Sequence, residues 1–338
     1  MSLVKFSKAS SAVIKNKRSF FEENEKHLRY VRKVNSLYVK QPPRTTCKTC
    51  NAKLSSRDDI HVQGVGYVIC DNCGHFNGRH EDTAEFAHQV YAADSGENYA
   101  VNYKKNFTSR VSDIYIPKAE FLRSVLKEQG LDVFAVTDVG CGGGHFVAAC
   151  EALGISCTGY DTNQELIELG SSMLNSNKVA VSDLEDVNLL IASVQTKVLT
   201  LIGVLEHLME PRRALESFVK SDASYLYLQV PLFSLSVLLE SAHPNVFPRQ
   251  LNAGHTHLYT ESSLNHLKSE FGLESVGEWW FGTDMVDLFR HLSVLSEVSG
   301  DKKDQVLSTM MGNHIDALQS VLDEKKLCSG VNLLLKKP

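Results

Sequence analysis

The stretch "VTDVGCGGGHF", Val136 to Phe146, places four glycines behind an aspartate at the end of a short apolar run. Glycine permits positive φ and close approach of the backbone to a ligand, so the pattern predicts a ligand-binding turn after a strand. A phosphate-binding loop of the G-x-x-x-x-G-K-[ST] type is excluded, because no lysine follows the glycines. The dinucleotide pattern G-x-G-x-x-G also fits poorly, because it would need a small residue at His145 or Val147.

Around this turn, short apolar runs alternate with segments of helical spacing. The alternation predicts an α/β fold with a doubly wound, Rossmann-like parallel sheet, whose ligands bind beyond the carboxyl ends of the strands. Thr162 and Glu165 are expected to form a capping box at the start of the second helix. The predicted strands are residues 134–140, 156–161, 178–183, 197–204 and 225–231, with a last strand at 330–337.

An acid two residues before G-x-G-x-G, formed by Asp138, Gly140, Gly142 and Gly144, resembles the first motif of class I S-adenosylmethionine-dependent methyltransferases. Further landmarks follow in that family's order: an acid closing the second strand, an acid closing the third, and the segment "LIGVLEHLMEP" (201–211) after the fourth. The resemblance covers about residues 134–282. The fourth strand departs from the family pattern, since "TKVLTLI" lacks the usual aspartate.

The resemblance implies that S-adenosylmethionine is the cofactor and that the glycines let the backbone lie against it. Asp161 stands 21 residues after Gly140, where a carboxylate can accept both ribose hydroxyls. Asp183 resembles the acid that faces the exocyclic amine of adenine. Alternatively, either acid could cap a helix and the glycines could serve close packing. The residues expected at the cofactor are Asp138, Gly140, Cys141, Gly142, Gly144, Asp161, Thr162, Asp183, Leu184 and Gly203.

Four cysteines, Cys47, Cys50, Cys70 and Cys73, form the pattern C-x2-C-x19-C-x2-C. Four thiolates suit tetrahedral Zn²⁺, and no ligand position is left open for water, so we expect a structural zinc site. The alternating segment "HVQGVGYVIC" (61–70) predicts a hairpin and hence a zinc-ribbon-like module. A pair of disulfides is the competing interpretation, which a reducing cytoplasm disfavours.

The composition, with 43% hydrophobic and 22% charged residues in 338, is that of a soluble globular chain of about two folding units. The chain has no apolar run of membrane-spanning length and no secretory signal, so we expect a cytoplasmic protein. Residues 1–46 carry eleven Lys and Arg against three Glu, which leaves the remainder at −13 in a chain of net charge −5. An acidic body repels phosphate backbones, so we expect no nucleic-acid partner and a leader packed on the body.

These observations divide the chain into four parts. A basic helical leader comes first, followed by the zinc-ribbon-like module, then by a tyrosine-rich linker with a helix that leads into the core, and last by the methyltransferase domain with a helical insertion. Tyr99 or Tyr103 in the linker is a candidate lid over a ligand. The insertion could cover the substrate or form a homo-oligomer contact. The predicted boundaries are 1–46, 47–80, 81–130 and 131–338, with the insertion at about 284–326.

The acceptor is expected to meet the chain after the fourth and fifth strands, because the cofactor fills the ends of the first three. A hydroxyl acceptor needs a base that works near neutral pH, and histidine suits that task. His207, His255 and His257 are the candidates; the last two stand two apart in an extended segment and should point the same way, or could bind a metal. Each could instead cap or pack. Further candidate pocket residues are Trp279, Trp280, Asp284 and Arg290.

The zinc module, the tyrosine-rich linker and the core together resemble bacterial sugar-modifying methyltransferases. The predicted function is therefore methyl transfer to a small molecule or glycan, with a nucleotide-linked or polysaccharide sugar as the favoured acceptor. Two alternatives stay open: an RNA methyltransferase that grips RNA with the zinc module and leader, and a non-catalytic scaffold that retains the cofactor fold. Against RNA stands the lack of a basic stripe interleaved with aromatic residues.

Overall fold

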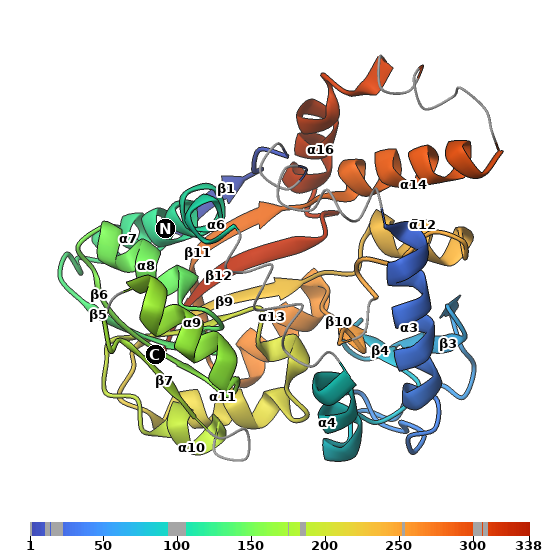
Figure 1. Cartoon of the computed structure of the whole chain (residues 1–338). Coiled ribbons are helices and arrows are strands. Elements are labelled where there is room, and N and C mark those ends of the chain that lie inside the picture. The colour runs from blue at the N-terminus through green and yellow to red at the C-terminus, as the bar shows by residue number, and fades with distance from the viewer. Residues whose placement is uncertain are drawn as a thin grey trace.

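The computed structural model describes residues 2–10, 14, 23–93, 106–174, 176–182, 187–251, 254–299, 306 and 310–338. They form a large, mostly parallel sheet with helices on both faces, and a small antiparallel sheet beside it (Figure 1). Two pairs of residues that the sequence analysis singled out lie outside the described residues: Tyr99 and Tyr103 of the linker, and Asp183 and Leu184 of the expected cofactor site.

Among the described residues, the large sheet has eight strands in the order β1-β11-β12-β9-β8-β5-β6-β7. Neighbouring strands pair in parallel, except that β12 is antiparallel to both β11 and β9. The winding reverses at β5, which pairs with β6 on one side and β8 on the other, so the predicted doubly wound α/β fold is confirmed. The strands are β1 Leu3–Phe6, β5 Ala135–Val139, β6 Ser156–Asp161, β7 Val179–Val181, β8 Val198–Ile202, β9 Tyr225–Pro231, β11 Glu274–Phe281 and β12 Gly330–Lys336.

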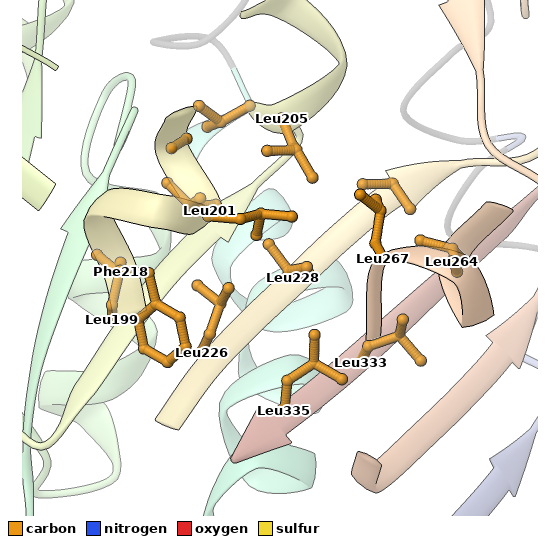
Figure 2. Close-up of a cluster of buried hydrophobic side chains, with 14 of the residues drawn as sticks. Leu199, Leu201, Leu205, Phe218, Leu226, Leu228, Leu264, Leu267, Leu333 and Leu335 are labelled. Atoms are coloured by element: carbon orange, nitrogen blue, oxygen red, sulfur yellow. The ribbon is translucent and has the colours of Figure 1, made fainter. Parts of the chain in front are cut away.

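Helices cover both faces because each buried strand presents apolar side chains alternately to the two sides. Leu226 and Leu228 of β9 pack toward Phe218 on one face, as Figure 2 shows, whereas Tyr225 and Tyr227 belong to the core on the other. The first face is covered by α10 (Val187–Ala192), α11 (Pro211–Lys220) and α13 (Glu261–Glu270), and the second by α7 (Ile116–Glu128), α8 (His145–Ala152) and α9 (Gln164–Leu174).

The helix that leads into the core is continuous with two short turns before it. These are α6 (Phe107–Arg110) and the π-helical turn η1 (Val111–Tyr115), which runs directly into α7. Its apolar residues at helical spacing, Phe121, Leu122, Val125 and Leu126, are all buried. The predicted helix that leads into the core is therefore confirmed.

The predicted capping box at the start of α9 is wrong. The helix begins at Gln164, and Asn163 acts as the cap, with its Oδ1 accepting the amide of Leu166 at 3.0 Å. Asn163 reaches this position because its own amide donates to Asp161 Oδ1 at 2.9 Å. Among the described helices, a capping box is instead present at Thr260 and Ser263, where α13 begins.

The small sheet has the order β10-β4-β3-β2; Cys70 and Cys73 lie on its β3–β4 turn, and Cys47 and Cys50 lie on a turn before β2. The predicted hairpin is confirmed: β2 and β3 pair antiparallel through a two-residue turn at Gln63 and Gly64, both with positive φ. The fourth strand, β10, comes from the long connection between α12 and α13 and pairs with β4. The strands are β2 Ile60–Val62, β3 Val65–Ile69, β4 Phe76–Gly78 and β10 His257–Leu258.

The N-terminal leader is divided between the two sheets. Strand β1 adds to the edge of the large sheet beside β11, while α3 (Asn24–Tyr38) buries Val34 and Tyr38 against the small sheet. The helix α4 (Ala84–Ala93) follows the small sheet and contributes Phe86 to the same cluster. The leader therefore connects the small sheet to the far edge of the large one.

Between β11 and β12 the chain forms α14 (Asp284–Ser299) and α16 (Ile315–Glu324), which stand at one end of the molecule (Figure 1). They pack with α12 (Leu235–Ala242), the helix that follows β9. Among the described residues, no helix combines the length and the apolar character needed to cross a membrane.

Candidate functional site

The glycine loop closes β5 in a conformation that only glycine adopts without strain. Gly140, Gly142 and Gly144 have φ of 75°, 53° and 73°. A Cβ on Gly140 would come within 2.4 Å of Val204 Cγ2, so this glycine is also required for close packing against the segment after β8. The amides of Gly140 and Cys141 both donate to the carbonyl of Tyr160, which fixes the loop against the end of β6.

Asp161, at the carboxyl end of β6, binds the glycine loop directly. Its Oδ2 accepts the amide of Gly142 at 2.7 Å, and its Oδ1 accepts the amide of Asn163 at 2.9 Å. Each carboxylate oxygen has a further lone pair for a ribose hydroxyl. Thus one carboxylate both shapes the loop and offers the acceptor groups that a nucleoside needs.

Asp138 is buried beneath the loop and has a partner that sequence reasoning missed. Thr200 of β8 lies beside it in register and donates from Oγ1 to Asp138 Oδ1 at 2.5 Å. Burial raises the pKa of Asp138 to about 7. Thr200 belongs to the strand that lacks the usual aspartate, so a hydroxyl takes a place beside the buried acid there.

Two other predicted cofactor residues lie around this loop. Thr162 is exposed just after Asp161, and Gly203 has φ of 69° at the end of β8. The fit to an adenosyl cofactor rests on these features together: a loop without side chains and a carboxylate with spare lone pairs at the ends of two adjacent parallel strands.

The four cysteines converge between two similar turns. Cys47 Sγ lies 3.6 Å from Cys73 Sγ, and Cys50 Sγ lies 3.5 Å from Cys70 Sγ. All four sulfur atoms lie within 4.8 Å of one another. Thiolates about 2.3 Å from a tetrahedral zinc would stand about 3.8 Å apart, so the spacing fits one zinc ion and is far beyond a disulfide bond.

The two cysteine turns have the same backbone hydrogen-bond pattern. The amide of Asn51 donates to the carbonyl of Cys47 at 2.9 Å, and the amide of Gly74 donates to the carbonyl of Cys70 at 2.8 Å. Both residues have positive φ, so each C-x-x-C pair curls to aim its sulfurs inward. A hydrogen bond from Cys73 lowers the pKa of Cys47 to about 5, whereas burial raises the pKa of Cys70 and the bond to Cys47 raises that of Cys73, so without metal one thiolate, that of Cys47, is favoured.

A second polar group lies at the carboxyl end of β8. Glu206 and His207 sit on the short 3-10 helix η2 (Leu205–His207), and His255 approaches them from the long connection. One side-chain ligand atom of each lies within 4.8 Å of the others. The group is close to the glycine loop, because Val204, two residues before Glu206, is the residue that crowds Gly140.

Backbone carbonyls orient both imidazoles of this group. His207 Nδ1 lies 3.0 Å from the carbonyl of Gly254, and His255 Nδ1 lies 2.7 Å from the carbonyl of Gln250. A carbonyl can only accept, so each Nδ1 carries the proton and Nε2 is the basic nitrogen of each ring.

Protonation in the group depends on its surroundings. Burial raises the pKa of Glu206 to about 8, and its Oε2 is buried without a hydrogen-bond partner. His207 keeps part of its surface exposed, yet desolvation by the protein around it lowers its pKa to about 4. At neutral pH the group therefore holds a protonated carboxyl beside a neutral imidazole.

His257 does not share a wall with His255, contrary to the sequence prediction. It is fully buried, and its Nδ1 lies 2.8 Å from His75 Nε2, inside the small sheet. Tyr259 packs edge-on against both rings. The reason is the pairing of β10 with β4, which turns His257 inward, whereas His255 precedes the strand. His257 therefore lies in the interior, where it cannot bind an acceptor at the surface.

The other candidate pocket residues fall in different places. Trp279 lines a cavity of about 300 Å³, while Trp280 on the opposite face donates from Nε1 to Glu278. Asp284 and Arg290 are buried in α14, where Asp284 Oδ1 accepts the hydroxyls of two serines, Ser234 and Ser236. Asp284 and Arg290 are therefore placed away from the cavity lining.

The polar network around α14 does reach the histidine group indirectly. Asp287 binds the guanidinium of Arg249, and Glu240 accepts the amides of Arg249, Gln250 and Leu251. The carbonyl of Gln250 in turn holds His255. Sequence reasoning missed these buried acids, and the one available signal was their presence in segments that are otherwise apolar.

One family model matches the central part of the chain. Residues 115–278 match the sequence model of a family described as a methyltransferase domain. No curated protein matches the chain. Together with the strand order and the glycine loop, the family match supports an S-adenosylmethionine-dependent methyltransferase.

Solved methyltransferase structures show a distant likeness. One is an S-adenosylmethionine-dependent methyltransferase from Archaeoglobus fulgidus, with 16% identity, a TM-score of 0.39, and coverage of 65% of this chain and 94% of that one. Another is magnesium protoporphyrin IX methyltransferase from Synechocystis PCC 6803, with 12% identity, a TM-score of 0.45, and coverage of 74% and 97%. A third is the plantazolicin methyltransferase, with 13% identity, a TM-score of 0.46, and coverage of 74% and 94%.

Proposed function

We propose that this chain transfers the methyl group of S-adenosylmethionine to a hydroxyl group of a sugar, free, nucleotide-linked or part of a glycan, with His207 accepting the hydroxyl proton. The observation that carries the proposal is the group formed by Glu206, His207 and His255 beside the glycine loop. It puts proton-accepting side chains at the sheet edge where the cofactor loop ends.

The cofactor, when bound, supplies an activated methyl group, so the chain need only hold the acceptor in line and remove its proton. Gly140, Gly142, Gly144 and Asp161 would hold the cofactor through the loop described above. The adenine contact expected from Asp183 stays a prediction.

His207 is the base that the geometry favours. Its Nδ1 is tied to the carbonyl of Gly254, so its Nε2 can take the acceptor proton. With a pKa of about 4, the His207 imidazole alone is a weak base. Once Glu206 is ionised, its carboxylate stabilises the imidazolium that forms and so strengthens the base. His255 lines the same group and is the second candidate.

The cysteine module supports this site from outside. We propose one structural zinc bound by Cys47, Cys50, Cys70 and Cys73, since the sulfur spacing fits. Its sheet includes β10, which begins two residues after His255, so the metal would help to hold the acceptor side of the molecule.

The test is incubation of purified protein with methyl-labelled S-adenosylmethionine and separate pools of nucleotide sugars, polysaccharide and RNA. Label in the sugar pools is the expected result. Label in RNA alone would overturn the proposal in favour of the RNA enzyme, and binding of the cofactor with label in none of the pools would favour the scaffold. A His207→Ala protein run in parallel shows whether any transfer depends on the proposed base, and a His61→Ala protein, altered at an exposed histidine of β2, is the matched control.

A further inference from the structure

A cavity of about 300 Å³ lies over the end of the large sheet where β11, β12 and β1 meet. The N-terminal segment with Lys5 and Lys8 forms one side, the η1 and α7 turns with Asp113 and Lys118 form another, and Trp279 and Asn332 belong to the sheet floor. The volume is at the lower end of the range for small-ligand pockets.

A row of side chains crosses four strands here; its first three members, Lys5, Trp279 and Asn332, line the cavity, and Gln229 continues the row beside Asn332. In the register of the sheet, Lys5 lies beside Trp279, Trp279 beside Asn332, and Asn332 beside Gln229. Residues in register share a face of the sheet, so these side chains stand on the face that α7 covers. On the same face of β9 and β12 the next residues inward are Tyr227 and Leu334, both in the core.

Asn332 has the features of a binding residue. Its side chain is fully buried, and neither its Oδ1 nor its Nδ2 has a hydrogen-bond partner. The neighbouring Gln229 Oε1 is also buried without a partner. Each such group costs about 1–3 kcal/mol unless it is satisfied, and Asn332 lines the cavity, so a polar molecule bound there would satisfy its amide.

Positive charge is concentrated around the same cavity. Lys5, Lys8 and Lys118 line it against a single carboxylate, that of Asp113. The pKa of Lys8 is lowered to about 8, mainly by burial. The charges of two further cations, Arg249 and Arg110, add to this decrease. An anion in the cavity would relieve this repulsion.

The cavity is connected to the proposed reaction site. The carbonyl of Gln229 accepts the amide of Gly203 at 3.0 Å, and Gly203 comes three residues before Glu206. The charge of Lys118 acts on both Asp138 and Glu206. One strand, β9, therefore lies between Asn332 in the cavity floor and the segment that carries the proposed base.

We propose that this cavity binds an oxyanion carried by the methyl acceptor, a phosphate or a carboxylate, with Lys8 and Lys118 supplying positive charge and Asn332 supplying hydrogen bonds. The proposal rests on the proposed function for the identity of the ligand as acceptor, and it narrows the acceptor to an anionic sugar derivative, such as a sugar phosphate, a nucleotide-linked sugar or a uronate.

The chain itself contains a reporter for this binding. It has two tryptophans, and Trp280→Phe leaves Trp279 in the cavity as the single tryptophan, whose emission is excited selectively over that of tyrosine at 295 nm or longer wavelengths. In this background, uridine diphosphate, pyrophosphate and glucuronate are titrated without S-adenosylmethionine. We expect a saturable change in emission; tighter binding of the two phosphates assigns a phosphate, and tighter binding of glucuronate assigns a carboxylate.

Two variants and a control decide whether the cavity is the site. Lys8→Met and Asn332→Leu should each weaken binding by about tenfold or more, since each removes a charged or buried hydrogen-bonding partner. Asn332→Leu should also raise the melting temperature of the ligand-free protein, because it removes a buried unpaired amide. Lys127→Met, on the exposed side of α7, should change binding less than twofold.

The proposal is overturned if no probe changes the emission, or if Lys127→Met weakens binding as much as Lys8→Met does. These binding results do not depend on catalysis. Anion binding without any methyl transfer would leave the cavity assigned and reject the proposed function, whereas transfer to a neutral sugar without anion binding would do the reverse.

Discussion

His75 Nε2 lies 2.8 Å from His257 Nδ1, and this contact joins the sheet that carries the cysteines to the connection that carries His255. Both imidazoles are fully buried, and burial lowers the pKa of each well below its usual value, so the pair is neutral. Two neutral rings can share one hydrogen bond without repulsion. The small sheet and the connection that carries His255 are therefore parts of one packed unit.

The first prediction concerns the metal. Purified protein should contain one zinc ion per chain, lost in Cys70→Ser and Cys73→Ser, because a three-thiolate site binds zinc more weakly. Thermal stability should fall in these variants, while affinity for S-adenosylmethionine, bound at the far strands, should change less. Metal analysis and calorimetry measure the two effects, with His61→Ala on exposed β2 as the control. A folded wild-type protein without metal would reject the site.

The second prediction concerns Asp161. Asp161→Ala should weaken S-adenosylmethionine binding by about 2–3 kcal/mol, because it removes the acceptor of the ribose hydroxyls and releases the Gly142 amide. Asp161→Asn keeps one acceptor oxygen and should lose less. Isothermal calorimetry measures both, and Glu165→Ala, an exposed acid in the first turn of α9, should leave the affinity unchanged. An unchanged affinity in Asp161→Ala would remove this residue from the cofactor site.

The third prediction concerns the base. His207→Ala should lower kcat by roughly 10²–10⁴ and leave cofactor affinity nearly intact, because proton removal acts on the chemical step. His255→Ala should show an effect of the same kind. His257→Ala should instead lower stability, since this ring is buried against His75. If the His207 and His255 variants both keep near-wild-type turnover, the acceptor needs no base and a carboxylate or phosphate oxygen becomes the better candidate.

The fourth prediction concerns pH. Glu206 has a pKa raised by burial to about 8, so it is protonated below that pH and ionised above it. Because the ionised form stabilises the His207 imidazolium, kcat/KM should rise with pH and level off above about 8. Glu206→Gln cannot ionise and should give a low rate without this rise, while Glu210→Gln, at an exposed glutamate, should keep the wild-type profile. An identical rise in Glu206→Gln would assign the titration to another group.

Much of the fold follows from local sequence patterns. The alternation of apolar runs and helical spacing predicted the doubly wound sheet, because each strand and helix must bury its own apolar face. The glycines after Asp138 predicted the loop, since positive φ is a property of the residue itself. The C-x-x-C pairs predicted the two tight turns in the same way, whereas the convergence of all four sulfurs also needs the β2–β3 hairpin between the turns.

Only the tertiary structure decided which residues and strands pair when the pairing depends on strand register or on segments far apart in sequence. No local pattern places Thr200 beside Asp138, Asn332 beside Gln229, or β10 against β4, because each pairing depends on how strands far apart in sequence align. The role of His257 changed for this reason: its spacing from His255 was known, but the strand that turns it inward belongs to residues almost two hundred positions earlier. A one-residue shift in a strand moves a side chain to the opposite face, so a pocket assembled across strands is decided only when the whole sheet has formed.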